Sequence, residues 1–413
     1  MYLIPIHVPI YTDGEKKFVT SDWMRSLVLL RDSLNGKFGQ LMLMAPSLPA
    51  SMAPSHTLEE LGEAATGIKV KSSFDLRCRA RYYWQTERFR WQSELAEAMR
   101  DAKVVHAGMD DLYRPIAFEG CLQAVRHNKP LIFVRDIDQV QQMREMASEL
   151  GLAARLKAEL YGFGFDRCMR YGVKKAALSL LKGKLLRDRY WRFASNPSAF
   201  EDTSFTTSEI VPFEVVKARI GTLRTLRAIR LVYCGRIEAR KGVDHGIKII
   251  AKAASLGMDV FFDVIGEGSD QAKCEALASE LGIGARVRFL GYKTYGKELL
   301  RYLAEYDGLL FTPLAEDTPR MIFDAYAAGL PVIAYGIEYV KERAGKEGAT
   351  VILPVNNPEE GGRLLAQLDG NRMRLGELAL KAREAATVNA ADVWYERRAQ
   401  WTFEAVERFY ARD

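Results

Sequence analysis

Short apolar runs alternate with segments of helical pattern through the second half of the chain, and this alternation constrains the fold most. The runs predict strands at residues 230–234, 260–265, 287–290, 308–312, 331–334 and 350–353. Helical segments are expected to begin near Val243, Ser269, Tyr295, Pro319 and Pro358. Such alternation predicts an α/β fold with a doubly wound parallel sheet, which binds ligands outside the carboxyl ends of its strands.

The first half of the chain has a similar but less regular pattern. Strands are expected at residues 3–10, 41–45, 68–70, 103–107, 130–135 and 178–181, and helices at 21–34 and 116–127. A chain of 413 residues, 48% hydrophobic and 27% charged, is long enough for two domains with separate cores. We expect the linker between them near residues 211–220.

Composition argues against several classes of protein. The net charge of +6, from 59 basic and 53 acidic residues, is too small to indicate a nucleic-acid or membrane partner by itself. Five scattered cysteines without a CxxC pair suit reduced thiols in the cytoplasm. We find no signal-peptide pattern and no run of the roughly 20 apolar residues that a membrane span needs. The five histidines lack metal-ligand spacing, so no metal site is expected.

Two cations follow the first strand of the second half. Gly235 and Arg236 come directly after this strand, and Lys241 precedes the next helix. Fixed cations at this place can stabilise the charge on a leaving diphosphate without a metal, an effect commonly worth about 3–4 kcal/mol per preorganised donor. A solvated basic loop is the alternative interpretation.

Two acids flank the start of the helix expected near Pro319. Glu316 precedes this helix and Asp324 lies within it. Thr318 is a suitable N-cap, and a proline fits the first helical turn. Because backbone N–H groups at a helix N-terminus suit a phosphate, acids on either side can hold hydroxyl groups around a diphosphate. The pattern predicts a nucleotide-sugar site.

The stretch 311–335 resembles the Glu-x7-Glu signature of retaining glycosyltransferases of the GT-B fold, family 4. Glu316 is the first acid, and Asp324 replaces the second. The rest of the signature is present as Ala325, Ala327, Ala328, Gly329, Pro331 and Val332. The family's Gly-Arg-x4-Lys-Gly pattern is matched by Gly235, Arg236, Lys241 and Gly242. The resemblance is specific across residues 230–355 and weak before them.

The resemblance implies two Rossmann-like domains that face a cleft. The first, residues 1–212, would hold the acceptor, and the second, residues 213–391, would bind the nucleotide-sugar. A terminal helix, residues 392–413, would cross back to the first domain.

The resemblance also implies roles for the residues of the second domain. Arg236 and Lys241 would act on the leaving diphosphate, Glu316 on the donor sugar and Asp324 on the ribose. The backbone of Pro319, Arg320 and Met321 would face the phosphates. Gly235, Gly266 and Gly268 would let the backbone pass close to the nucleotide. The latter pair is not a dinucleotide motif, since Gln271 stands where GxGxxG has its third glycine.

Acceptor-side candidates lie in the first domain. In the resembled family the loop after the first strand borders the acceptor, which suggests Asp13 and Gly14; an ordinary turn is the alternative. Arg135 and Asp136 stand where the family often has a His-Asp pair beside the donor sugar. Asp136 and Asp138 also form a DxD sequence, which we discount because the motif is short and the diphosphate features lie far downstream.

Residues 77–91, RCRARYYWQTERFRW, interleave five arginines with five aromatic residues. A helix with its aromatic side chains packed inward is one interpretation. Contact with an anionic membrane surface or a lipid-linked acceptor is the second. Single-stranded nucleic acid is the third, and it is not among the partners that we predict.

These features together predict a retaining hexosyltransferase. It would move a hexose-type sugar from a nucleoside-diphosphate sugar to a glycan, lipid-linked or small-molecule acceptor, in cell-surface polysaccharide or glycoconjugate synthesis. The leaving phosphate would accept the proton of the acceptor, so no cofactor or metal is expected. We expect the protein in the cytoplasm, at the inner face of the plasma membrane. A degenerate GT-B binding or scaffold protein and a nucleotide-sugar epimerase are the alternatives.

Overall fold

The computed structural model describes residues 1–53, 58–140, 143–144, 151–223, 228–316 and 318–411. The chain forms two compact units. The N-terminal unit comprises Met1–Asp202 together with Trp394–Asp413, and the C-terminal unit comprises Thr203–Val393. The division at Asp202 falls earlier than the predicted boundary at residue 212.

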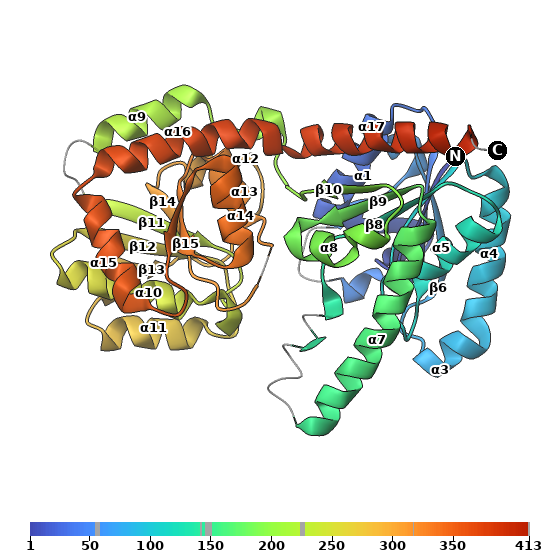
Figure 1. The fold of residues 1–413 in the computed structure, drawn as a ribbon, viewed down its shortest axis with the longest axis horizontal. Helices are drawn as coiled ribbons and strands as arrows, with labels where there is room; N and C mark the ends of the chain where they lie inside the picture. The colour runs from blue at the N-terminus through green and yellow to red at the C-terminus, as the bar shows by residue number, and fades with distance from the viewer. Residues whose placement is uncertain (54–57, 141–142, 145–150, 224–227, 317, 412–413) are drawn as a thin grey trace. The chain divides into compact units, whose positions relative to one another are not determined.

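The C-terminal unit is built on one parallel sheet (Figure 1). Its strands are β11 (Ile229–Cys234), β12 (Val260–Ile265), β13 (Val287–Phe289), β14 (Gly308–Phe311), β15 (Val332–Tyr335) and β16 (Thr350–Leu353). They lie in the order β13-β12-β11-β14-β15-β16, and each neighbouring pair is parallel. This is the strand order of the Rossmann fold. The predicted doubly wound sheet is confirmed, and each strand agrees with its predicted range to within one residue.

Helices cover this sheet on both faces, which leaves every residue of β14 and β15 buried. They are α9 (Phe213–Leu223), α10 (Val243–Ser255), α11 (Gln271–Glu280), α12 (Lys297–Leu303), α13 (Met321–Ala327), α14 (Glu338–Glu347), α15 (Pro358–Asp369) and α16 (Arg372–Asn389). Helix α10 shows how such a helix packs on the sheet. Its residues Val243, Ile247 and Ile250 recur at helical spacing and are buried on one face.

Helix α9 corrects the predicted linker at residues 211–220. Val216 in this helix is fully buried. The Arg219 guanidinium donates hydrogen bonds to the carbonyls of Ala304 and Ala328, at 2.9 and 3.3 Å. This segment is therefore part of the C-terminal unit rather than a linker, because it supplies core and satisfies carbonyls at helix ends.

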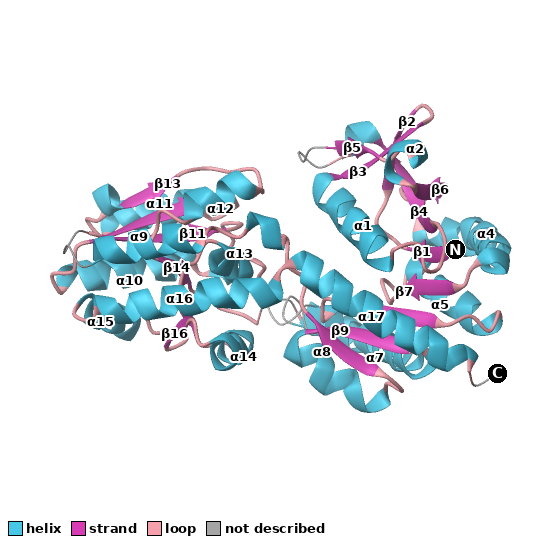
Figure 2. Ribbon diagram, turned by 90° about the horizontal axis from the view of Figure 1, so that it is seen from above, coloured by secondary structure: helices cyan, strands magenta, loops and turns pink. Residues whose placement is uncertain are grey.

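The N-terminal unit contains a second, larger sheet (Figures 1 and 2). Its strands are β1 (Tyr2–Pro5), β2 (Ile10–Asp13), β3 (Lys16–Thr20), β4 (Leu41–Pro49), β5 (Leu58–Glu60), β6 (Ile68–Asp75), β7 (Val104–Ala107), β8 (Leu131–Arg135), β9 (Leu178–Lys182) and β10 (Pro197–Phe200). The order is β10-β9-β8-β7-β1-β4-β2-β3-β5, and β6 also pairs with β4. Strands β3 and β5 extend an otherwise parallel sheet in antiparallel fashion.

One strand expected at residues 3–10 is two strands in the structure. Strand β1 ends at Pro5 and β2 begins at Ile10. Pro9 lies between them, and a proline cannot donate to a strand ladder. The chain leaves β1 here and pairs again further along β4.

The helices of the N-terminal unit are α1 (Ser21–Leu34), α2 (Glu63–Thr66), α3 (Ala80–Tyr82), α4 (Arg88–Asp101), α5 (Ile116–Arg126), α7 (Leu152–Lys175) and α8 (Gly183–Tyr190). The predicted helix at 21–34 is confirmed at both ends. The last helix, α17 (Ala391–Tyr410), belongs to the N-terminal unit from Trp394 onward. None of the helices in the described part of the chain has both the length and the apolar character that a membrane span requires.

Candidate functional site

The centre of the C-terminal sheet is a topological switch point. Strands β11 and β14 are neighbours there, while the chain continues from them toward opposite edges of the sheet. In open α/β sheets ligands bind outside the carboxyl ends of such strands. The predicted cations follow β11 and the predicted acids follow β14, so the topology brings both groups to one place.

Backbone contacts hold the two loops together. The Leu314 amide donates to the Arg240 carbonyl at 2.9 Å, and the Thr312 hydroxyl donates to the Gly242 carbonyl at 2.7 Å. Gly242 has a φ of +66°, and a Cβ there would lie 1.9 Å from the Thr312 carbonyl oxygen. Only glycine fits at this crossing.

The predicted glycine turn packs against the β11 loop in the same way. A Cβ on Gly266 would lie 2.0 Å from the Gly235 carbonyl oxygen, and one on Gly268 would lie 2.1 Å from the Ile237 carbonyl oxygen. The Gly235 amide donates to the Ile265 carbonyl at 2.9 Å. The three predicted glycines are therefore brought together, and their local role is close packing of the loops after β11 and β12.

The cations lie along the loop after β11. The Arg236 guanidinium is exposed and its Nη1 is 2.9 Å from Glu238 Oε1. Glu238 also pairs with Arg240 at 3.1 Å, so one carboxylate orders two arginines. Lys241 ends a short 3-10 turn, Ala239–Lys241, immediately before α10. Sequence reasoning did not single out Glu238.

Asp324 lies beside β11 and the loop after β13. The Tyr295 hydroxyl donates to Asp324 Oδ1 at 3.0 Å. Burial, and secondarily the nearby charge of Asp324, raise the pKa of the Cys234 thiol at the end of β11 to about 12. Tyr295 was expected to begin a helix, but α12 begins at Lys297 and leaves Tyr295 in the loop. Nothing in its sequence context marked it as a partner of Asp324.

Glu316 lies toward the opposite side of the switch point. Its Oε1 accepts a hydrogen bond from the backbone amide of Glu338, at the start of α14, at 2.8 Å. Its Oε2 is buried and has no partner among the described residues. The two acids therefore point into different neighbourhoods, Asp324 toward the β11 and β13 loops and Glu316 toward the loop after β15.

The helix between the acids starts later than predicted. Helix α13 begins at Met321, and Arg320 occupies the N-cap position without a capping side-chain hydrogen bond. The predicted cap, Thr318, and Pro319 precede the helix. The amides of Phe323 and Asp324 are already bonded to the Arg320 carbonyl, and proline has no N–H. Of the three residues expected to face phosphates, Pro319 therefore has no backbone N–H to donate.

A further polar pair lies at the same edge of the sheet and was not predicted. Nδ1 of His245, in the first turn of α10, is 3.0 Å from the Tyr335 hydroxyl at the end of β15. Burial lowers the pKa of this histidine. No group of three or more His, Cys, Asp or Glu side chains suited to a metal ion occurs among the described residues.

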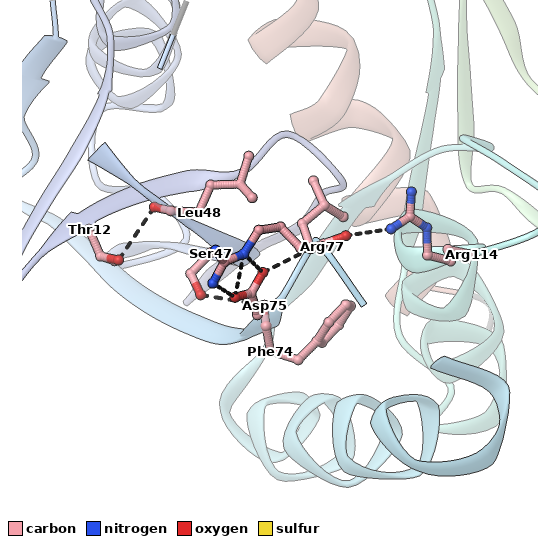
Figure 3. Close-up of polar contacts among 8 residues, drawn as sticks. Thr12, Ser47, Leu48, Phe74, Asp75, Arg77 and Arg114 are labelled. Atoms are coloured by element: carbon pink, nitrogen blue, oxygen red, sulfur yellow. Dashed lines mark hydrogen bonds and ion pairs between the residues drawn. The ribbon is translucent and has the colours of Figure 1, made fainter. Parts of the chain in front are cut away.

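The acceptor-side candidates of the N-terminal unit lie on separate strands. Asp13 and Gly14 are exposed at the turn of the β2–β3 hairpin, where Asp13 pairs with Lys16. Figure 3 shows the neighbouring contacts, in which Thr12 donates to the Leu48 carbonyl at 3.4 Å. This geometry is that of a hairpin turn, the alternative given for these residues.

Arg135 is buried, and its guanidinium forms hydrogen bonds with neighbouring loops. It donates to the carbonyls of Ile137 and Met109 and to the Gln139 side chain. Asp136 is exposed beside it. The strands β7, β1 and β4 separate β8 from β2, so the structure does not bring Asp136 next to Asp13 within the sheet. In the discounted DxD sequence, Asp138 is tied to Arg189 at 3.1 Å.

The arginine and aromatic stretch is only partly packed inward. Tyr83 and Trp91 are fully buried, whereas Tyr82, Trp84 and Phe89 are 50%, 42% and 62% exposed. Three arginines have acidic partners: Arg77 pairs with Asp75 (Figure 3), Arg88 with Glu119 and Arg90 with Glu94. The Arg77 guanidinium lowers the pKa of Asp75. The inward-packed interpretation thus holds for two of the five aromatic side chains.

Comparison with known proteins supports the predicted fold of both units. Over 98% of this chain and 99% of the other, the structure is similar to the crystal structure of Anabaena HepE in complex with UDP, with a TM-score of 0.67 and 13% identity. The chain has the GT-B fold. Residues 222–387 match the family model of Glycosyl transferases group 1. This part of the GT-B chain lies in the C-terminal unit and contains the loops after β11, β12, β13, β14 and β15.

Curated relatives match parts of this GT-B chain. It is 31% identical over 141 residues to the 2-deoxystreptamine glucosyltransferase of Streptomyces kanamyceticus. It is 35% identical over 106 residues to the lipopolysaccharide 1,6-galactosyltransferase of Escherichia coli. These matches cover 34% and 25% of this chain, and 36% and 29% of the respective relatives.

Proposed function

We propose that this protein is a retaining glycosyltransferase that uses a nucleoside-diphosphate sugar. The observation that carries the proposal is the switch point of the C-terminal unit. There the loops after β11 and β14 are bonded to each other and carry Arg236, Lys241 and Glu316, and Asp324 lies in the helix that follows β14. The family match over residues 222–387 supports the same assignment.

The proposed chemistry assigns one task to each group. Asp324 holds ribose hydroxyls at the β11 side, and Glu316 contacts the donor sugar at the β15 side. Arg236 and Lys241 stabilise the negative charge that develops on the leaving diphosphate, so two fixed cations act where other enzymes use a metal ion. Arginine suits a forked contact to phosphate oxygens, and lysine supplies a point charge. The leaving phosphate takes the proton of the attacking hydroxyl, so the sugar is transferred with retention.

We propose a hexose-type sugar as the transferred group and a glycan, lipid-linked or small-molecule acceptor held by the N-terminal unit. The naming of one relative as a lipopolysaccharide galactosyltransferase supports a place in cell-surface polysaccharide or glycoconjugate synthesis. Such a place suits the cytoplasm, with peripheral contact to the inner face of the plasma membrane through residues 77–91. The UDP in the complex of the similar Anabaena protein makes UDP-sugars the first donors to test.

Ligand binding and turnover test this function directly. A panel of UDP- and GDP-sugars should contain one donor that raises the unfolding temperature, since ligand at 100 times its dissociation constant stabilises by about 2.7 kcal/mol. With that donor and an acceptor extract, the protein should release nucleoside diphosphate. Arg236→Ala and Lys241→Ala should each lower turnover by about 10²-fold or more at unchanged unfolding temperature. Lys273→Ala, an exposed lysine of α11, is the matched control.

The outcomes separate this function from the alternatives. Wild-type rates in both cation variants at saturating donor would remove them from the leaving-group role. Donor binding without turnover would favour a binding or scaffold protein, and rearrangement of the sugar without acceptor would favour an epimerase.

A further inference from the structure

Helix α7 (Leu152–Lys175) is apolar on two opposite faces. One face packs into the N-terminal unit through Ala158, Tyr161, Phe165, Met169 and Val173, all of which are buried. On the other face Leu152, Leu156, Leu160 and Phe163 are 82%, 63%, 67% and 66% exposed. These four residues follow one another at spacings of four, four and three, which places them on one side of a helix. A surface helix normally presents polar residues to water on that side.

A second exposed apolar group lies next to α7. It consists of Tyr82, Trp84 and Phe89, from α3, the π-helical turn that follows it and α4. The Trp84 indole N–H donates to the Tyr113 carbonyl at 2.8 Å, and the Tyr113 ring lies 5.5 Å from the ring of Tyr161 in α7. Tyr113 is itself 48% exposed.

The loop that carries Tyr113 therefore contacts both the turn that carries Trp84 and the packed face of α7. Figure 1 shows α3 and the N-terminal half of α7 extending from the same lower side of this unit. We call the exposed apolar residues on this side of the unit the apolar face: Tyr82, Trp84, Phe89, Tyr113, Leu152, Leu156, Leu160 and Phe163. Exposed apolar surface gathered in this way indicates an interaction site.

Positive charge is concentrated on the same elements. Residues 77–91 contain five arginines and one acid, and α7 contains six cations and two acids. Each segment therefore carries a formal charge of +4, and the two together exceed the +6 of the whole chain. Of the acids on α7, Glu159 is neutralised by Arg144 at 2.8 Å. Among the described residues, Arg79 and Arg81 have no ion pair.

We propose that the apolar face is a docking surface for an anionic lipid bilayer. The leucines and Phe163 of α7 enter the boundary between headgroups and acyl chains. Trp84 and Tyr82 lie at headgroup level, and Arg79 and Arg81 meet lipid phosphates. The inference deepens the peripheral contact proposed above, because it names α7 as the inserting element, and it does not depend on the transfer chemistry.

Charge and composition favour a bilayer over a second copy of this chain. Two copies facing each other through this surface would bring together two segments of +4 on each side, and like charges oppose that contact. A bilayer with acidic headgroups attracts the same charge. Aromatic residues interleaved with cations beside an apolar stripe are the composition of interfacial helices.

Vesicle flotation with the full-length protein tests the proposal. Wild type should float with vesicles of phosphatidylglycerol and phosphatidylcholine, and much less with phosphatidylcholine alone. The triple variant Leu156→Gln, Leu160→Gln, Phe163→Gln should bind at least tenfold more weakly. Its matched control changes three exposed apolar residues of the C-terminal unit, Leu256→Gln, Leu281→Gln and Met373→Gln, and should float like wild type.

Backbone hydrogen exchange gives a second readout that does not require a variant. Amides 152–163 should exchange more slowly in the presence of the anionic vesicles, and amides of α11 should not change. UDP binding by the triple variant, measured by calorimetry, should equal that of wild type. Failure of the transfer function would appear in that nucleotide assay and leave the flotation result untouched.

Three results would overturn the proposal. One is equal flotation of the triple variant and wild type, which would limit the membrane contact to residues 77–91. Another is the absence of wild-type flotation with anionic vesicles. The last is protection of amides 152–163 by raised protein concentration without lipid, together with a sedimenting dimer, which would assign the face to a second copy.

Discussion

At the scale of single residues, Asp324 is the most informative position. Its side chain is one methylene shorter than the glutamate of the resembled signature. The Tyr295 hydroxyl, which donates to it at 3.0 Å, gives the short carboxylate a fixed orientation beside β11. Glu316 is oriented instead by a backbone amide of α14. Because different groups orient the two acids, we expect their removal to have different effects.

The acid pair should separate nucleotide affinity from turnover. Asp324→Asn should weaken binding of the free nucleoside diphosphate by about 1.5–3 kcal/mol, the range for a hydrogen bond to a charged group. Glu316→Gln should mainly lower the rate constant, because contacts to the reacting sugar are realised in the transition state. Titration calorimetry and turnover measure the two effects. Equal nucleotide affinity in wild type and Asp324→Asn would exclude Asp324 from the nucleotide site.

Tyr295 should act only through Asp324. Tyr295→Phe should weaken nucleoside-diphosphate binding by about 0.5–1.5 kcal/mol, because it removes one hydrogen bond that orients the carboxylate. In the double variant with Asp324→Asn, the loss should be close to that of Asp324→Asn alone, since contacting residues are not additive. Calorimetry on the four proteins checks this. Simple addition of the two losses would show that Tyr295 contributes independently.

At the scale of elements, the start of α5 depends on a carboxylate in the loop that precedes it. Asp110 accepts hydrogen bonds from the amides of Ala117 and Phe118, at 3.0 and 3.3 Å. These amides are among those that a helix leaves without internal partners. Burial raises the pKa of Asp110 from 3.8 to about 7. The helix is therefore coupled to pH through one side chain.

The stability of the N-terminal unit should fall as pH rises from about 4 to about 7. In that window the unfolded chain has already lost the Asp110 proton and the folded chain retains it, so unfolding releases a proton and is favoured by rising pH. The free energy of unfolding should decrease by up to about 4 kcal/mol over this range and be level above it. Denaturant titrations at several pH values measure the change.

Asp110→Asn should remove most of this pH dependence, because the amide accepts a hydrogen bond without titrating. Asp13→Asn, at the exposed hairpin turn, is the control and should behave as wild type. A pH profile of Asp110→Asn that overlays the wild-type profile would contradict the assignment.

At the scale of the whole molecule, α17 adds structure to the N-terminal unit from the far end of the chain. The Phe403 ring lies 5.5 Å from that of Phe38, and Lys37 pairs with Glu407 at 3.0 Å. The Tyr410 hydroxyl donates to the Lys103 carbonyl, also at 3.0 Å. The N-terminal unit is therefore incomplete without the last residues of the chain.

Truncation after residue 393 should destabilise one unit and spare the other. The N-terminal unit should lose about 3 kcal/mol or more, because Ala405 and Val406 and the ring contacts of Phe403 leave the core. Nucleoside-diphosphate affinity should stay within twofold of wild type, since the switch point lies wholly in Thr203–Val393. Calorimetric scans and UDP titration measure both. Loss of nucleotide binding with an unchanged scan would contradict this division.

The sequence alone determined most of the C-terminal unit. Its strands are short, and the central ones are buried on both faces, so continuous apolar runs mark the strands to within one residue. The alternation predicts a doubly wound parallel sheet, and such a sheet has a switch point where ligands bind. Arg236 and Glu316 could be placed at one sheet edge because each lies in the loop that follows a strand.

Only the tertiary structure decided where helix α13 begins, which side chain Asp324 contacts and which aromatic side chains are buried. Helix α13 begins at Met321 rather than Pro319. Tyr295 reaches Asp324 across 29 positions of sequence, and only packing reveals such a pair. In residues 77–91 every aromatic side chain looks alike in sequence. The fold buries Tyr83 and Trp91 and exposes Trp84 and Phe89, because the helix has only one side facing the core.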